Sequence, residues 1–171
     1  MNHKIIALGI LTLSLIQLPS LAKIQNTTKD NEKQFGKEII SKQFTDDKWK
    51  FNGKKVYKCP LFGWQIEALF KDGKSYSESA RPKEKNAKKD LITEQEANVI
   101  ADMLFEKKDR GDYRKQVKNA HFISHFFENG VISYEMKLDA SGKNHIGVMG
   151  VRAILYSNGE KFKDIKINAY H

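Results

Sequence analysis

The stretch best suited to chemistry reads HFISHFF and begins at His121. His121 and His125 are four positions apart, and side chains alternate between the two faces of a strand, so both imidazoles are expected on one face. Histidine serves as a general acid, a general base or a metal ligand near neutral pH. A hairpin turn at Asn129-Gly130 would place Tyr134 opposite His125. The pattern therefore indicates a candidate ligand site of His121, His125 and Tyr134.

Two interpretations of this histidine face remain open. One is a small hydrolase or a metal- or ligand-binding domain, and the other is an ordinary core whose histidines bond to Tyr134 or to the backbone. A zinc site needs a third ligand. Glu135 falls on the opposite face of the predicted hairpin and does not supply one. We therefore expect no catalytic residue, no metal and no cofactor here.

A second candidate is a basic segment between positions 107 and 118. Clustered cations suit contact with phosphates or other polyanions, and the net charge of +9 favours acidic partners. Tyr113 is the one aromatic residue in the segment, so stacking on nucleic-acid bases is not expected. A solvated surface with a lysine-protected sheet edge is the alternative. The candidate polyanion-binding residues are Lys107, Lys108, Arg110, Arg114, Lys115 and Lys118.

The remaining search for catalytic motifs is negative. The sequence contains no glycine-rich phosphate loop, no HExxH, no GxSxG and no paired-cysteine metal motif. Ser124 adjoins His125, but neighbouring strand residues point to opposite faces and cannot form a nucleophile–base pair. We therefore expect a non-enzymatic binding or interaction module. Its partner would be an anionic polymer, a lipid surface of the cell envelope or a protein, and its oligomeric state is left open.

The first 22 residues have the pattern of a secretory signal peptide. Lys4 precedes an apolar run at positions 5–18, and Ser20 and Ala22 supply the small residues of a cleavage site. We expect cleavage after Ala22 and export to the periplasm or beyond. No later apolar run reaches the roughly 20 residues that a membrane-spanning helix needs. Cys59 is the single cysteine, so an internal disulfide is excluded, and its apolar neighbours favour a buried thiol.

After the signal, a flexible polar leader is predicted at 23–47 and a single α+β domain at 48–171. Alternating apolar residues from Trp64 to Phe70 predict a strand. A turn at Asp72-Gly73 would pair Phe70 with Ser75 and then leave Glu67 and Glu78 facing each other on an exposed surface. Thr93 and Glu96 form a capping box that predicts the start of a helix. That helix would bury an apolar stripe of Ala97, Ile100, Ala101, Leu104 and Phe105 and end near Lys108.

The remainder of the domain is predicted to be β-structure. Apolar segments at 120–127, 131–138, 145–156 and 162–170 are separated by turn residues, including Asn129-Gly130 and Asn158-Gly159. The order is a hairpin, a helix and a four-stranded meander. We therefore expect one antiparallel sheet of about six strands with one main helix packed on one face. This is similar in general architecture to cystatin-like and NTF2-like sheets, and the residues themselves identify no family.

Overall fold

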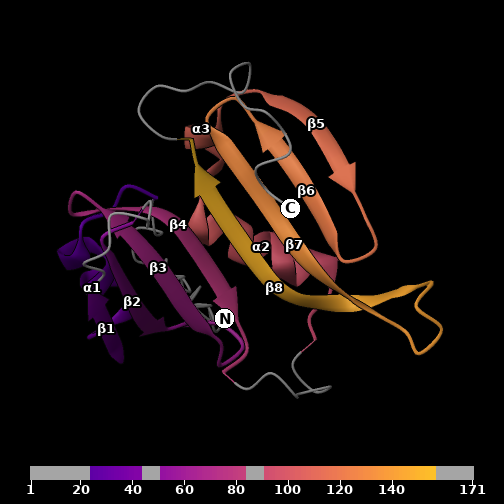
Figure 1. Cartoon of the computed structure of the whole chain (residues 1–171), viewed down its shortest axis with the longest axis horizontal. Helices are drawn as coiled ribbons and strands as arrows, with labels where there is room; N and C mark the ends of the chain where they lie inside the picture. The colour runs from indigo at the N-terminus through magenta and orange to yellow at the C-terminus, as the bar shows by residue number, and fades with distance from the viewer. Residues whose placement is uncertain (1–23, 44–50, 84–90, 157–171) are drawn as a thin grey trace, which may run out of the picture.

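The computed structural model describes residues 24–43, 51–83 and 91–156, and every structural statement below concerns this part of the chain. Eight strands form one antiparallel sheet in the order β1-β2-β3-β4-β8-β7-β6-β5 (Figure 1). The strands are β1 (Ile40–Gln43), β2 (Gly53–Lys58), β3 (Gln65–Lys71), β4 (Lys74–Arg81), β5 (Tyr113–Lys118), β6 (Phe122–Phe127), β7 (Gly130–Leu138) and β8 (His145–Leu155). The helices are α1 (Thr28–Phe35), α2 (Glu94–Leu104) and α3 (Lys107–Arg110).

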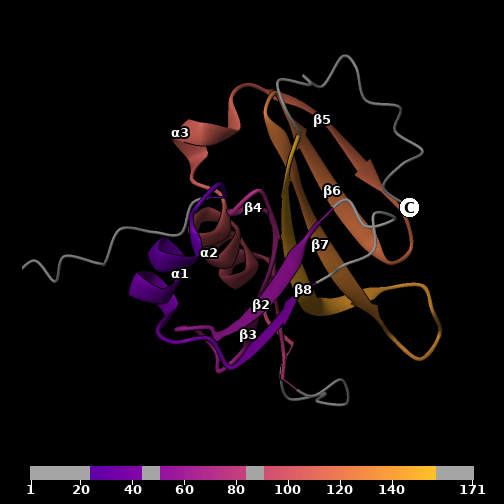
Figure 2. The same cartoon turned by 60° about the vertical axis from the view of Figure 1, so that its left-hand side comes forward.

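The sheet consists of two four-stranded meanders joined side by side. Strands β1 to β4 form the first meander and β5 to β8 the second, and β4 pairs with β8 to join them. All three helices lie on one side of the sheet (Figure 2). We call the opposite side the open face. The predicted α+β class and single antiparallel sheet are confirmed, whereas the expected number of about six strands is corrected to eight among the described residues.

Helix α2 forms where the capping box predicts it. Thr93 Oγ1 accepts a hydrogen bond from the Glu96 amide at 3.2 Å, and Glu96 Oε2 accepts one from the Thr93 amide at 2.8 Å. The helix ends at Leu104 rather than near Lys108, because Phe105 adopts an extended conformation with φ −144° and ψ 100°. The entire predicted stripe is buried in the core between α2 and the sheet: Ala97, Ile100, Ala101, Leu104 and Phe105.

The expected polar leader at 23–47 is corrected, because α1 and β1 lie within it. Thr27 and Asp30 form a second capping box, with the Thr27 amide donating to Asp30 at 2.9 Å. Two apolar side chains, Ile24 and Phe35, are buried in the main core. The segment therefore packs as part of the domain. Its few apolar residues were too widely spaced to show a helical period.

The second meander begins earlier than expected. Residues Tyr113–Lys118 form strand β5, ahead of the first strand expected at 120–127, and Gly111 precedes it with a positive φ of 70°. The fourth strand predicted at 162–170 lies outside the described residues. The described meander therefore gains β5 at its outer edge. Among the described residues, no helix is both long and apolar enough to cross a membrane.

A β-bulge changes the predicted register of β3 and β4. Phe70 pairs with Ser75 as expected, but Leu69 then pairs with Ser77, which leaves Tyr76 as the extra residue. A bulge inserts one residue and so reverses the faces of every residue beyond it. Glu78 therefore lies opposite Ala68 on the helix side and is fully buried, instead of facing Glu67 on the surface.

The turn between β6 and β7 is shifted by one residue from the Asn129-Gly130 prediction. Gly130 is the first residue of β7, and the turn residues are Glu128 and Asn129. A Cβ at Gly130 would clash with the Ile154 carbonyl oxygen and lie 2.7 Å from the Phe105 ring. The glycine is thus used for close packing within the sheet. His125 consequently pairs with Ile132 rather than with Tyr134.

Candidate functional site

A pocket of about 450 Å³ opens on the sheet, and its lining comes from strands β4 to β8 and the β5–β6 turn. Ser124 pairs with Ser133 and Ser133 with Arg152, so short side chains lie between strands β6 and β8. The two serine hydroxyls are 2.9 Å apart and hydrogen-bond to each other. Neighbouring positions on the same face of these strands carry larger side chains, such as Phe126 and Ile154. The pocket therefore forms where the short serine side chains lie between larger ones.

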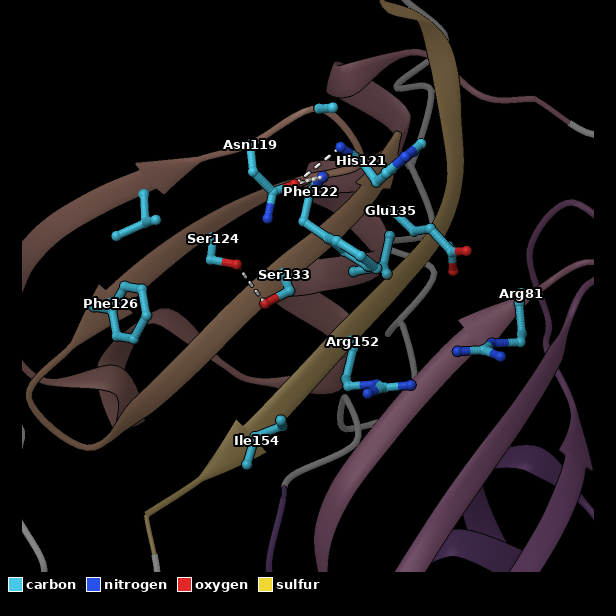
Figure 3. Close-up of a pocket in the computed structure, with 14 residues that line it drawn as sticks. Arg81, Asn119, His121, Phe122, Ser124, Phe126, Ser133, Glu135, Arg152 and Ile154 are labelled. Carbon is cyan, nitrogen blue, oxygen red and sulfur yellow. Dashed lines mark hydrogen bonds between the residues drawn. The ribbon is translucent and has the colours of Figure 1, made fainter. Parts of the chain in front are cut away.

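One end of the pocket is apolar. Phe126 and Ile154 lie at this end, on β6 and β8 (Figure 3). Phe126 belongs to a small buried cluster with Val131 and Tyr156, against which Val117 packs. This cluster is separate from the main core on the helix side. It supplies a fixed apolar wall against which the body of a ligand can pack.

The other end of the pocket carries two guanidinium groups. Arg81 is the last residue of β4 and Arg152 lies on the adjoining β8, where it pairs with Ser79. The guanidinium groups point toward each other in Figure 3. Within the described part of the chain, neither makes an ion pair. The pocket thus has a cationic end whose guanidinium donors form no ion pair with the described residues.

Charge and partial loss of water both act on Arg152. Its side chain remains exposed overall, but partial burial lowers the pKa of its guanidinium, and the nearby positive charge of Arg81 lowers it further. The negative charges of Glu135 and Glu67 oppose this effect and raise the pKa. Arginine nevertheless stays protonated in proteins. The two like charges therefore repel each other in a place where an anion would stabilise both.

Glu135 contributes a carboxylate beside this cationic end. It pairs with Phe122 on β6 and with Gly150 on β8. A Cβ at Gly150 would lie 3.0 Å from Glu135 Oε2, so the glycine leaves the space that the carboxylate occupies. Glu135 makes no ion pair within 4.0 Å among the described residues. It balances part of the positive charge without covering the two guanidinium groups.

The turn between β5 and β6 forms the rim of the pocket. Asn119 Oδ1 accepts hydrogen bonds from the backbone amides of His121 at 2.9 Å and Phe122 at 2.8 Å (Figure 3). The ring of His145 lies 3.3 Å from the carbonyl oxygen of Ala120. Asn119, Ala120 and His121 all line the pocket. These contacts hold the rim in one conformation.

The predicted site of His121, His125 and Tyr134 does not come together. His121 lies in the turn before β6 and lines the pocket on the open face. His125 points to the helix side, where its ring centroid is 5.5 Å from that of Tyr134. The Tyr134 hydroxyl donates to Asn98 of α2 at 2.7 Å. The alternation of side chains between the two faces of a strand did not apply to His121, because that residue precedes the strand.

Burial governs the titration of the two residues that do meet. Loss of water lowers the pKa of His125, with Glu94 and Arg110 acting in opposite directions. Burial also raises the pKa of Tyr134 to about 12. Near neutral pH the pair is thus uncharged and packs as a ring contact between β6, β7 and α2. Among the described residues, no three His, Cys, Asp or Glu side chains meet in a group that could hold a metal ion.

The six cations of the basic segment make separate local contacts instead of forming one basic patch. Arg110 is buried, and its guanidinium donates to the Phe105 carbonyl at 2.7 Å and to Asp102 at 2.6 Å. Lys107 also contacts Asp102, at 3.2 Å, and Lys108 contacts Glu106 at 2.6 Å. Arg110 therefore connects α3 to the end of α2 and is not available to a polyanion.

The other three cations of the basic segment belong to the edge strand β5. Arg114 is 3.7 Å from Glu128 and 4.0 Å from Asp112. The Lys115 ammonium lies 5.4 Å from the centroid of the Phe126 ring, and Lys118 is exposed at the end of the strand. Acidic residues thus accompany most of the six cations. The sequence of the basic segment at 107–118 does not show these ion pairs, because the acidic partners Asp102 and Glu128 lie outside the segment.

Cys59 is a free thiol buried in the main core, as its apolar neighbours indicated. Burial raises the pKa of the thiol, with a smaller opposing effect from the Leu61 backbone. The thiolate is the reactive form of cysteine. Because its environment favours the protonated thiol, Cys59 fits a structural role and not that of a nucleophile.

Sequence reasoning missed the three residues that shape the charged end of the pocket. The sequence patterns did not single out Arg81 or Gly150, and Glu135 was considered only as a metal ligand. The available signal was that Arg152 and Glu135 alternate with apolar residues on strands, which marks them as facing away from the core. That alternation does not show that Arg81 lies beside Arg152 and Glu135 in the folded protein.

Comparisons with known proteins identify no family for this chain. No protein-family model matches the chain, and no curated protein matches it either. Among solved structures, the chain is similar to a cysteine-rich secretory protein from Staphylococcus aureus, with a TM-score of 0.37 and 16% sequence identity. The match covers 77% of this chain and 44% of that chain, so it spans less than half of the other protein. A likeness this weak carries no conclusion about function.

Proposed function

We propose that this chain is an exported, non-enzymatic binding module that takes a small anionic ligand with an apolar body in the pocket of the open face. The observation that carries the proposal is the pair of guanidinium groups, Arg81 and Arg152, which point toward each other at one end of the pocket and make no ion pair in the described part of the chain. Export is inferred from the signal-like pattern that ends at Ala22.

Charge and hydrogen bonding both favour an anion at the cationic end. Each guanidinium presents N–H donors in a planar fork that matches the oxygens of a carboxylate or a phosphate. An anion placed between the two arginines would reduce their mutual repulsion. The apolar end, with Phe126 and Ile154, would bury the rest of the ligand. The pocket volume of about 450 Å³ is within the range of small-molecule sites.

A binding role fits the pocket better than a catalytic one. Its two strand serines, Ser124 and Ser133, bond to each other at 2.9 Å, and among the described residues neither hydroxyl hydrogen-bonds to a basic side chain. A nucleophilic serine needs a base within hydrogen-bond reach. The alternative of a hydrolase or ligand site at His121, His125 and Tyr134 is less well supported, because His121 and His125 lie on different sides of the sheet.

The experiment is a calorimetric titration of the purified protein with decanoate, a simple carboxylate with an apolar chain. The double variant Arg81→Gln, Arg152→Gln should bind roughly 10- to 100-fold more weakly, since hydrogen bonds to charged groups contribute about 1.5–3 kcal/mol. The matched control is Lys107→Gln, Lys108→Gln, which removes the same charge far from the pocket and should keep the wild-type affinity. Equal losses in both double variants would refute a specific site.

A further inference from the structure

We propose that the pocket selects ligands whose charged group carries a single negative charge, such as a carboxylate, and that Glu135 is the residue that sets this selectivity. The inference rests on the proposed function, since it concerns the same pocket. It goes further because it names the ligand class and a residue that discriminates between anions.

The balance of charge at the cationic end supports a monoanion. Arg81 and Arg152 contribute two positive charges and Glu135 contributes one negative charge. Glu67, whose charge also acts on Arg152, is already paired with Lys54 at 2.9 Å. A carboxylate would bring this group of charges to neutrality. A phosphate monoester carries close to two negative charges above neutral pH. It would leave one uncompensated negative charge beside Glu135, and like charges close together are unfavourable where water is reduced.

The position of Glu135 is built into the sheet. Its strand partner on β8 is Gly150, and Glu135 Oε2 lies 3.0 Å from the point where a Cβ at position 150 would be. Any larger residue there would displace the carboxylate. In Figure 3 Glu135 lies on the same side of the pocket as Arg81, away from Phe126. The carboxylate therefore lies beside the place where the charged group of a ligand would lie.

Glu135 is close to the arginines without being bound to them. Its charge acts on Arg152, whose pKa it raises. No ion pair within 4.0 Å joins it to either arginine among the described residues. Within the described residues the guanidinium donors are thus not engaged in an ion pair and can contact a ligand, while the carboxylate repels additional negative charge. Discrimination by a repulsive group of this kind is a common way to obtain specificity.

The apolar part of the ligand is expected to extend toward Phe126 and Ile154. The walls at this end are aromatic and aliphatic, and Val117 adds to them from β5. An unbranched or aromatic body of modest size would bury its surface there without reaching the cationic end. The ligand class is therefore a small carboxylic acid with an apolar body.

The test compares three ligands with the same chain at pH 8: decanoate, decyl phosphate and decanol. Wild-type protein should bind decanoate about tenfold more tightly than decyl phosphate, and decanol more weakly than decanoate. Glu135→Gln should remove or reverse the preference between the two anions, because decyl phosphate gains affinity. Glu94→Gln, which changes the charge equally on the helix side, should retain the wild-type preference.

The outcomes separate this inference from the proposed function. If wild-type protein binds decyl phosphate as tightly as decanoate, and both depend on Arg81 and Arg152, the selectivity proposal is wrong and the anion site stands. If the two anions bind no better than decanol, or if the arginine variants bind normally, both proposals fail. If Glu135→Gln loses affinity for decanoate as well as for decyl phosphate, Glu135 positions the guanidinium groups instead of discriminating between anions, and the selectivity proposal is wrong.

Discussion

The side-chain amide of Asn31 in α1 donates a hydrogen bond of 3.2 Å to Oε1 of Glu78 in β4, and both residues are fully buried. This bond connects the first helix to the central strand that adjoins β8. The second carboxyl oxygen, Glu78 Oε2, has no hydrogen-bond partner of good geometry among the described residues. The charged carboxylate is therefore incompletely compensated in the core, which is costly.

We predict that the Glu78 carboxyl makes stability depend on pH. Burial raises its pKa from 4.5 to about 7, and Ser75 and Asn31 oppose this only in part. The folded state thus binds the proton more tightly than the unfolded chain. The stabilising contribution is complete below about pH 4.5 and is lost as the pH rises to about 7, with a total of about 3 kcal/mol.

Comparison with Glu78→Gln isolates this effect. Glutamine keeps the shape and an acceptor for Asn31 but cannot ionise. The difference in unfolding free energy between wild type and variant, measured by denaturant titration, should shift in favour of the variant between pH 5 and pH 8. Glu67→Gln, which removes a partly exposed carboxylate on the neighbouring strand, is the matched control for the loss of one negative charge. A pH-independent difference for Glu78→Gln would refute a buried proton.

A second prediction concerns Gly130. A methyl group at this position would clash with the Ile154 carbonyl oxygen and lie 2.7 Å from the Phe105 ring. Gly130→Ala should therefore lower stability by about 1–3 kcal/mol or more, as overpacking does. Gly53→Ala is the matched control, since its nearest contact is 3.7 Å and its φ is not positive. Thermal melting of the two variants checks this, and similar midpoints would contradict the close approach.

Arg110 should behave as a structural residue. Its guanidinium connects the Phe105 carbonyl and Asp102 from a buried position. Arg110→Met should destabilise the fold by about 2–4 kcal/mol, because a buried acceptor loses a charged donor. Lys107→Met removes a side chain that is 78% exposed and should change stability by less than about 0.5 kcal/mol. Equal stabilities of the two variants in urea would favour the alternative that Arg110 belongs to an exposed binding surface.

The cap of α2 provides a fourth prediction. Thr93 and Glu96 satisfy each other's backbone amides at the helix start. Thr93→Ala should cost about 1 kcal/mol, whereas Thr93→Ser, which keeps the hydroxyl, should cost clearly less. The midpoint of urea unfolding gives both values. If the two substitutions cost the same, the hydroxyl contributes nothing and the helix start depends on packing alone.

Local patterns predicted a large part of this fold. The Thr93–Glu96 box placed the start of α2, and the alternation from Trp64 to Phe70 placed β3. These signals involve residues within a few positions of each other, so they survive any tertiary arrangement. The 23–47 leader failed because the burial of Ile24 and Phe35 depends on contacts with distant strands. A polar segment with few apolar residues does not show such contacts in its own pattern.

The sequence by itself determined the class of the protein: an antiparallel sheet with one main amphipathic helix, and a chain without a recognisable catalytic motif. Tertiary structure alone decided the candidate site. Arg81 and Arg152 are far apart in the chain and meet only because β4 pairs with β8. The bulge at Tyr76 determines which side of the sheet each later residue of β4 faces, and so buries Glu78. Strand pairing and register depend on the packing of the whole sheet, and a one-residue slip exchanges its two faces.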